Sequence, residues 1–240
     1  KNFTILMLLA FCCLGLNAKT VTDVITGDAL LKKYPDQYGT KYYSFPGMTF
    51  DSDAEYNIKC RVNENANNAI VMNTTDSDRG IVTTKSGGIV KKIIVTWAAK
   101  SATAKREIDV YAQKTNYTSP SDLFDYYAQG DYLGTIEYSG SNLQETVTFN
   151  VPTNLGDFEY VGLVCYGNPV TVDKIEIVWE VEAPTTVAVP VGPSGISSFC
   201  SDYDLDFSGQ SDVTAWVATG VTKDNSVTLE QVQQVPAGVG

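Results

Sequence analysis

The segment that decides the fold is GIVTTKSGGIVKKIIVTW, residues 80–97. It predicts a short strand, a turn at residues 87–88 and a long second strand. Side chains alternate between the two faces of a strand, so Ile93, Val95 and Trp97 fall on one face. A ladder of β-branched residues that ends in Trp is typical of one wall of a two-sheet core.

The same pattern returns late in the chain, where KIEIVW (174–179) echoes KIIVTW (92–97). We therefore expect both Trp97 and Trp179 to be buried. Helical periodicity is almost lacking, and a single short helical turn is predicted at 119–124 from its Ser cap and its Pro. Turn residues separate further short strands, which are predicted at 21–25, 42–45, 56–62, 69–72, 106–112, 132–138, 146–151 and 158–165. This pattern predicts an all-β, antiparallel jelly-roll β-sandwich.

The chain is predicted to contain four segments. Residues 1–18 read as a signal peptide, because a basic residue precedes an apolar run and Ala18 suits cleavage; we expect a secreted or cell-surface protein. Residues 19–181 form the jelly-roll domain. EAPTTVAVPVGPSG (182–195) is a Pro-rich linker. Residues 196–240 begin a second β-rich module, which we expect to be truncated because three strands close no useful core.

Composition excludes several classes of function. The formal net charge is −11, without a basic stripe, which disfavours nucleic acid and anionic membranes as partners. The apolar N-terminal run is too short to span a bilayer, so no membrane insertion is expected after the signal peptide is removed. The chain has no His, which removes Ser-His-Asp and Cys-His catalysis and His metal ligands. Cys60 and Cys165 could pair, but we favour unpaired, buried thiols. Nothing indicates the oligomeric state.

Five motifs in a fixed order resemble a known family: GIVTTKSGGIVKKIIVTW, IDVYAQKTNYTSPSDLFD, QGDYLGTI, FEYVGLVCYG and VDKIEIVW. They are similar to the galactose-binding-like jelly-roll domain at the N-terminus of secreted, modular Bacteroidetes surface proteins. FCSDYDLDFSGQSDVTAWVATGV and VTLEQVQQVPAGVG resemble a β-rich repeat from the same kind of protein. The resemblance implies architecture and location, and it supplies no catalytic residue.

Tyrosines beside turns suggest a glycan-binding site. Aromatic faces stack on the C–H faces of sugars, and nearby Asp or Asn side chains can bind hydroxyl groups. The candidate residues are Tyr117, Tyr126, Tyr127, Tyr166, Asp131 and Asn168. The alternative is that these tyrosines are ordinary packing residues. The predicted function is weak, non-catalytic binding of a neutral polysaccharide, or adhesion, because like charge disfavours acidic polymers.

Two pairs of Asp residues could contribute oxygen ligands to a structural Ca²⁺ ion: Asp51 with Asp53, and Asp76 with Asp78. We favour plain turn chemistry for both pairs, and we expect no other cofactor. Two alternatives to glycan binding stay open. One is a structural spacer within a larger secreted protein. The other is a glycoside hydrolase, whose pair of carboxylates the spacing along the sequence cannot reveal.

Overall fold

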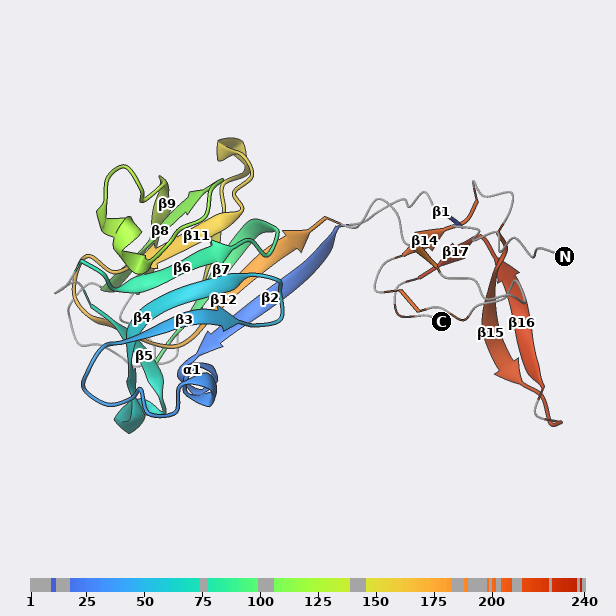
Figure 1. Cartoon of the computed structure of the whole chain (residues 1–240), viewed down its shortest axis with the longest axis horizontal. Coiled ribbons are helices and arrows are strands. Elements are labelled where there is room, and N and C mark those ends of the chain that lie inside the picture. Colours follow the sequence, from blue (N-terminus) through green and yellow to red (C-terminus); the bar gives the residue numbers. More distant parts are fainter. Residues whose placement is uncertain are drawn as a thin grey trace, which may run out of the picture. The chain divides into compact units, whose positions relative to one another are not determined.

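The computed structural model of the chain divides into two compact units (Figure 1). One is Thr20–Val181, and the other combines Lys1–Lys19 with Glu182–Gly240. Each unit is considered by itself. The structure describes residues 10–11, 18–73, 77–98, 106–138, 146–182, 188–189, 198, 200–201, 204–208, 213–224, 226–236 and 238.

The unit Thr20–Val181 is built from antiparallel strands in two layers around one core. The first layer contains β2 (Lys19–Thr26), β5 (Ala69–Met72), β7 (Ile89–Trp97), β10 (Thr146–Asn150) and β12 (Val170–Val181). The second layer has the order β3 (Tyr43–Thr49), β4 (Glu55–Asn63), β6 (Gly80–Lys85), β11 (Tyr160–Val164), β8 (Arg106–Gln113) and β9 (Asp131–Tyr138). Strand β4 joins the layers, because its first half pairs with β6 and its last residues pair with β5.

The connections are those of a jelly roll. From β7 the chain crosses to β8 and β9 in the second layer, returns to β10, crosses to β11 and returns to β12. The predicted all-β jelly-roll sandwich is therefore confirmed. Strand β12 lies between β7 and β2, so the first and last strands of the unit are neighbours (Figure 1).

The described residues contain one α-helix, α1 (Gly27–Lys33), which the sequence analysis did not predict. The Thr26 hydroxyl caps it by accepting the Ala29 N–H at 3.1 Å. Asp28 in its first turn and Lys32 in its last turn suit the helix dipole. Three short 3₁₀ helices complete the set: η1 (Glu64–Ala66), η2 (Pro120–Phe124) and η3 (Thr153–Leu155). Helix η2 is the predicted helical turn.

The core is formed by the inward faces of both layers. Trp97 and Trp179 are buried, as predicted. Ile93 and Ile177 face each other across β7 and β12 in the same ladder. At the far side, Gly134 of β9 lies so close to β10 that a Cβ atom there would be 3.0 Å from the Phe149 ring. Strands β9 and β10, at the two ends of the strand order, thus approach each other and nearly close the sheet.

A buried carboxylate joins four parts of the unit. Asp23 on β2 is fully buried and accepts a hydrogen bond from the Trp179 Nε1–H at 2.8 Å. It also accepts the Tyr56 hydroxyl of β4. Ser52, between β3 and β4, donates its N–H at 2.6 Å and its hydroxyl at 2.5 Å. The carboxylate therefore ties β2, β4, β12 and one loop together.

Two cysteines of this unit are buried and unpaired. Cys60 and Cys165 are both free thiols, in agreement with the prediction. Burial raises the pKa of the Cys60 thiol far above its usual value, which keeps it protonated and unreactive.

The second unit consists of short strand pairs. β1 (Ala10–Phe11), inside the predicted signal peptide, pairs with β13 (Ala188–Val189). β14 (Leu205–Asp206) pairs with β17 (Gln234–Val235). β15 (Ala215–Val221) and β16 (Val227–Val232) form a hairpin. No helix in the described part of the chain is long and apolar enough to cross a membrane.

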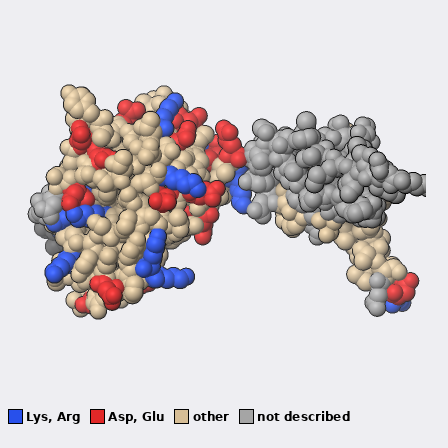
Figure 2. All heavy atoms as spheres, viewed as in Figure 1, with Lys and Arg blue, Asp and Glu red and all other residues tan. Residues whose placement is uncertain are grey.

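One face of the unit Thr20–Val181 shows charged residues that are dispersed (Figure 2). On the face shown in Figure 2, Lys and Arg side chains lie among Asp and Glu side chains, with broad uncharged areas between them. This face therefore presents no extended field of one sign.

Replacing Asp23 with Ala should destabilise the unit strongly. The Tyr56, Trp179 and Ser52 donors would lose their shared acceptor, and each unsatisfied buried donor costs about 1–3 kcal/mol. We expect the free energy of unfolding to fall by about 3 kcal/mol or more, measured by urea denaturation. Asp53→Ala removes the exposed carboxylate next to Ser52 and should change the free energy of unfolding by less than about 0.5 kcal/mol. Equal effects of the two substitutions would contradict this account.

Alkaline pH should also destabilise the unit. Burial, and then the charge of Asp23, raise the pKa of the Tyr56 phenol well above its usual value. The folded protein therefore retains a proton that the unfolded chain releases above about pH 10, so the free energy of unfolding should fall there. Urea denaturation across this pH range should show that the free energy of unfolding decreases less with pH in Tyr56→Phe than in the wild-type protein. An identical pH dependence in the two proteins would exclude Tyr56 as a source.

Candidate ligand-binding surface

The outer face of the second layer carries its own aromatic cluster. On β8, Ile108, Val110 and Ala112 point into the main core. Tyr111 lies between them on the other face, because successive side chains of a strand alternate. There it joins a separate buried cluster, whose other members are Val82, Tyr117, Leu123 and Val164.

Helix η2 packs directly on this outer face. A Cβ atom at Gly162 of β11 would lie 2.3 Å from Leu123 Cδ2, so a larger residue at this position would displace the Leu123 side chain. Asp122 accepts the Thr118 N–H at 2.6 Å and the Ser119 N–H at 3.2 Å, which fixes the start of the helix. The loop between β8 and β9 is thereby anchored to the sheet.

Four aromatic rings form a row from η2 across the outer face of the sheet. The centroids of Phe124 and Tyr166 are 5.5 Å apart, those of Tyr166 and Tyr111 6.4 Å, and those of Tyr111 and Tyr132 5.5 Å. Tyr132 is 55% exposed and Tyr166 is 41% exposed, whereas Tyr111 is nearly buried between them. The row therefore presents two tyrosine rings to solvent.

The two exposed rings of the row are held by their own hydroxyl groups. Tyr166 donates its hydroxyl to the Leu123 carbonyl. Thr135 donates to Asp109 Oδ1 at 2.6 Å, so the Tyr132 hydroxyl must be the donor in its 2.5 Å contact with Thr135. Burial is the main reason why the pKa of Tyr166 is raised. Both rings are positioned before any ligand arrives.

Two further tyrosines project from the loop between η2 and β9. Tyr126 is 80% exposed and Tyr127 is 94% exposed, and their rings meet edge to face with centroids 5.4 Å apart. The Tyr127 N–H donates to Asp125 Oδ1 at 2.9 Å, and the Asp125 carbonyl accepts the Gln129 N–H at 2.9 Å. The loop backbone is therefore ordered by local hydrogen bonds.

Five of the six predicted glycan-binding residues are exposed in the structure. Tyr126, Tyr127 and Tyr166 are exposed and available to a ligand. Asp131, at the start of β9, and Asn168, in the turn after β11, are exposed as well.

Tyr117 needs correction, because it is completely buried. Its hydroxyl donates to the Gln129 carbonyl at 2.8 Å, and its ring packs under the loop. Burial raises its pKa far above the usual value for tyrosine. Tyr117 therefore holds the surface in place and cannot stack on a ligand. Tyr132 was missing from the predicted set, although strand alternation and its pairing with Tyr111 place it on the outer face.

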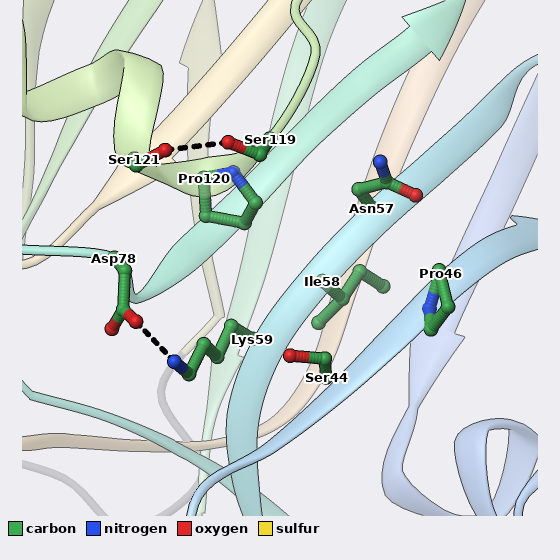
Figure 3. Close-up of a pocket in the computed structure, with 9 residues that line it drawn as sticks. All are labelled: Ser44, Pro46, Asn57, Ile58, Lys59, Asp78, Ser119, Pro120 and Ser121. Carbon is green, nitrogen blue, oxygen red and sulfur yellow. Dashed lines mark hydrogen bonds and ion pairs between the residues drawn. The ribbon is translucent and has the colours of Figure 1, made fainter.

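The predicted Ca²⁺ ligands do not form a site among the described residues. Asp51 and Asp53 are exposed in the loop between β3 and β4, and Asp76 lies outside the described residues. Asp78 belongs to a different loop and forms an ion pair with Lys59 of β4 (Figure 3). In the part of the chain that the structure describes, no three His, Cys, Asp or Glu residues are grouped so that they could hold a metal ion.

No protein-family model matches the chain, and no curated protein matches it either.

The two kinds of tyrosine should respond differently to truncation. Tyr117→Ala removes a buried ring and should lower the free energy of unfolding by about 3–5 kcal/mol, the range for large aromatic core residues. Tyr127→Ala removes an exposed ring and should change it by less than about 0.5 kcal/mol. Thermal and urea denaturation of both variants would measure the difference. A stable Tyr117→Ala protein would contradict the packing role.

Proposed function

We propose that the unit Thr20–Val181 is a non-catalytic module that binds a neutral glycan weakly. The tyrosine surface would make the contact; its exposed rings are Tyr126, Tyr127, Tyr132 and Tyr166. The observation that carries the proposal is the row of rings from η2 across the outer face of the sheet, two of them open to solvent. Flat aromatic rings can cover the C–H faces of successive sugar residues, as amphipathic aromatic side chains do at other interfaces.

Preorganisation supports this choice. The hydroxyls of Tyr132 and Tyr166 are already engaged with the protein, so their rings lose little conformational freedom when a ligand binds. Stacking on aromatic rings gives few directional contacts to a sugar, however. We therefore expect dissociation constants in the micromolar to millimolar range.

Charge supports a neutral ligand. Asp109 lies beside the row, Asp125 and Asp131 lie beside the exposed tyrosines, and the formal net charge of the chain is −11. Sulfated or uronate-rich polymers would be repelled by like charge. Together with the predicted signal peptide, this favours a secreted module acting on uncharged polysaccharides.

Affinity electrophoresis of the full chain in gels containing neutral polysaccharides tests the proposal. The wild-type protein should be retarded, and combined Ala substitutions of the four exposed tyrosines should weaken binding by at least about tenfold. Tyr38→Ala is the matched control, since it removes a ring that is 46% exposed and outside the tyrosine surface. It should bind like wild type.

Three results would contradict the proposal. If no neutral polysaccharide retards the wild-type chain, the structural spacer becomes the better account. If the four substitutions leave binding unchanged, the ligand contacts another surface. Release of reducing sugar from a bound polysaccharide would instead support the hydrolase alternative.

A further inference from the structure

A carboxylate lies among the rings of the tyrosine surface. Strand alternation places Asp109 on the same outer face of β8 as Tyr111, about 7 Å along the strand. In the sheet, Asp109 lies between β9, which carries Tyr132, and β11, which leads to Tyr166. Burial is the main cause of the raised pKa values of Tyr111 and Tyr166, and the charge of Asp109 adds to both. The carboxylate is therefore close enough to act on the same ligand as the rings.

One oxygen of this carboxylate is fixed and the other is open. Asp109 Oδ1 accepts the Thr135 hydroxyl at 2.6 Å, and Thr135 in turn accepts the Tyr132 hydroxyl at 2.5 Å. Asp109 is half-buried, and its Oδ2 atom is reached by solvent and has no hydrogen-bond partner among the described residues. The side chain is thus held in place by Thr135, with one acceptor left for a ligand.

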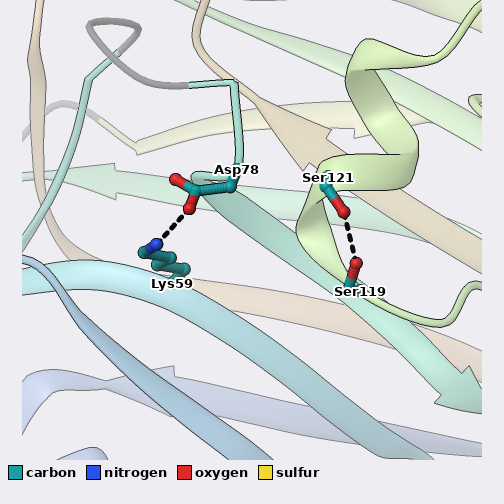
Figure 4. Close-up of polar contacts among 4 residues, drawn as sticks. All are labelled: Lys59, Asp78, Ser119 and Ser121. Carbon is teal, nitrogen blue, oxygen red and sulfur yellow. Dashed lines mark hydrogen bonds and ion pairs between the residues drawn. The ribbon is translucent and has the colours of Figure 1, made fainter.

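The charge of Asp109 is not neutralised by a basic side chain. In the part of the chain that the structure describes, no Lys or Arg residue forms an ion pair with it. Arg106, the basic residue of β8, donates to the Pro169 carbonyl. On the same layer, Lys59 is engaged with Asp78 (Figure 4). The tyrosine surface therefore carries a negative charge that a ligand can compensate.

Aromatic rings and an open carboxylate together favour a ligand with a positive charge. The face of a tyrosine ring attracts a cation within about 6 Å of the ring centroid. A protonated amine brings three N–H donors and a counter-charge, whereas a sugar hydroxyl brings one proton and no charge. The net charge of −11 also attracts cations from a distance. The surroundings of Asp109 thus suit an ammonium group better than a hydroxyl group.

We propose that the tyrosine surface preferentially binds glycans whose amino sugars carry a free, protonated amine. The amine donates to Asp109 Oδ2, and the sugar rings stack on Tyr132 and Tyr166. This preference rests on the function proposed above and specifies its ligand: neutral glycans bind weakly, and glycans with a free amine bind more tightly. Acetylation of the amine removes its charge and with it this advantage.

Two oligosaccharides that differ only at nitrogen test the preference. One is a β-linked oligomer of glucosamine, and the other is the same oligomer with every amine acetylated. In an NMR titration of the full chain in mildly acidic buffer, where the amines are protonated, the first should bind at least about tenfold more tightly. The backbone amides of Asp109, Thr135 and Tyr166 should shift saturably as it binds.

A charge-removing variant assigns the preference to one residue. Asp109→Asn keeps the size of the side chain, and its remaining oxygen can still accept the Thr135 hydroxyl. The variant should unfold at the wild-type temperature and bind the two oligomers with about equal affinity. Asp53→Asn is the matched control, because it makes the same change in net charge at an exposed position in the loop between β3 and β4. It should retain the preference of the wild-type protein.

Two outcomes with these variants and ligands would overturn the assignment. A preference that persists in Asp109→Asn would arise from the net charge of the chain and not from this carboxylate. Equally strong competition by Nα-acetyl-lysine amide would mean that the surface recognises an ammonium group on any carrier, including a peptide.

The two oligomers also separate the preference for an amine from glycan binding itself. Equal affinities for the wild-type protein would overturn the preference and leave the proposed function standing. No shift with either oligomer would overturn the preference as well, and electrophoresis in neutral polysaccharides would then decide on glycan binding. If those polysaccharides fail to retard the chain while the Asp109-dependent preference is found, the preference stands and the ligand is restricted to amino sugars.

Discussion

The unit Thr20–Val181 depends on a buried carboxylate that joins strands and a loop beside its hydrophobic core. Burying a carboxylate is unfavourable unless every lone pair finds a donor. Asp23 meets this condition with donors from Ser52, Tyr56 and Trp179, which are far apart in the sequence and meet only in the folded state. Apolar side chains would tolerate several packings of the two layers. Four directional hydrogen bonds to one carboxylate are satisfied in only one arrangement of β2, β4 and β12.

The tyrosine surface depends on a second constraint, which is steric. The Leu123 side chain of η2 fills the space that Gly162 leaves on the sheet. Tyr117 then fills the space beneath the loop, and Phe124 reaches the ring of Tyr166. Exposed rings on this face are therefore supported by buried ones. A surface that would be mobile on an unsupported loop is fixed to the rigid part of the fold.

The sequence was sufficient to predict the jelly roll, because β-strand alternation and turn residues are local signals. Trp97 and Trp179 were correctly predicted as core residues for this reason. Asp23 could not be recognised, since an Asp in an alternating strand ordinarily faces solvent and its donors are remote. Tyr117 was misplaced because proximity to a turn does not reveal which face of a loop is covered. Lys59 and Asp78 meet only through the pairing of β4 with β6, which the sequence does not specify.

The pairing of β2 with β12 has a mechanical consequence. The chain enters the unit at the start of β2 and leaves it at the end of β12, and both points lie together in Figure 1. Tension along the polypeptide would therefore separate these strands from one end, breaking their hydrogen bonds one after another instead of all together. Under such a force, β2 and β12 would be the first strands of this unit to separate. While folded, it adds almost nothing to the reach of the chain, because its ends are adjacent.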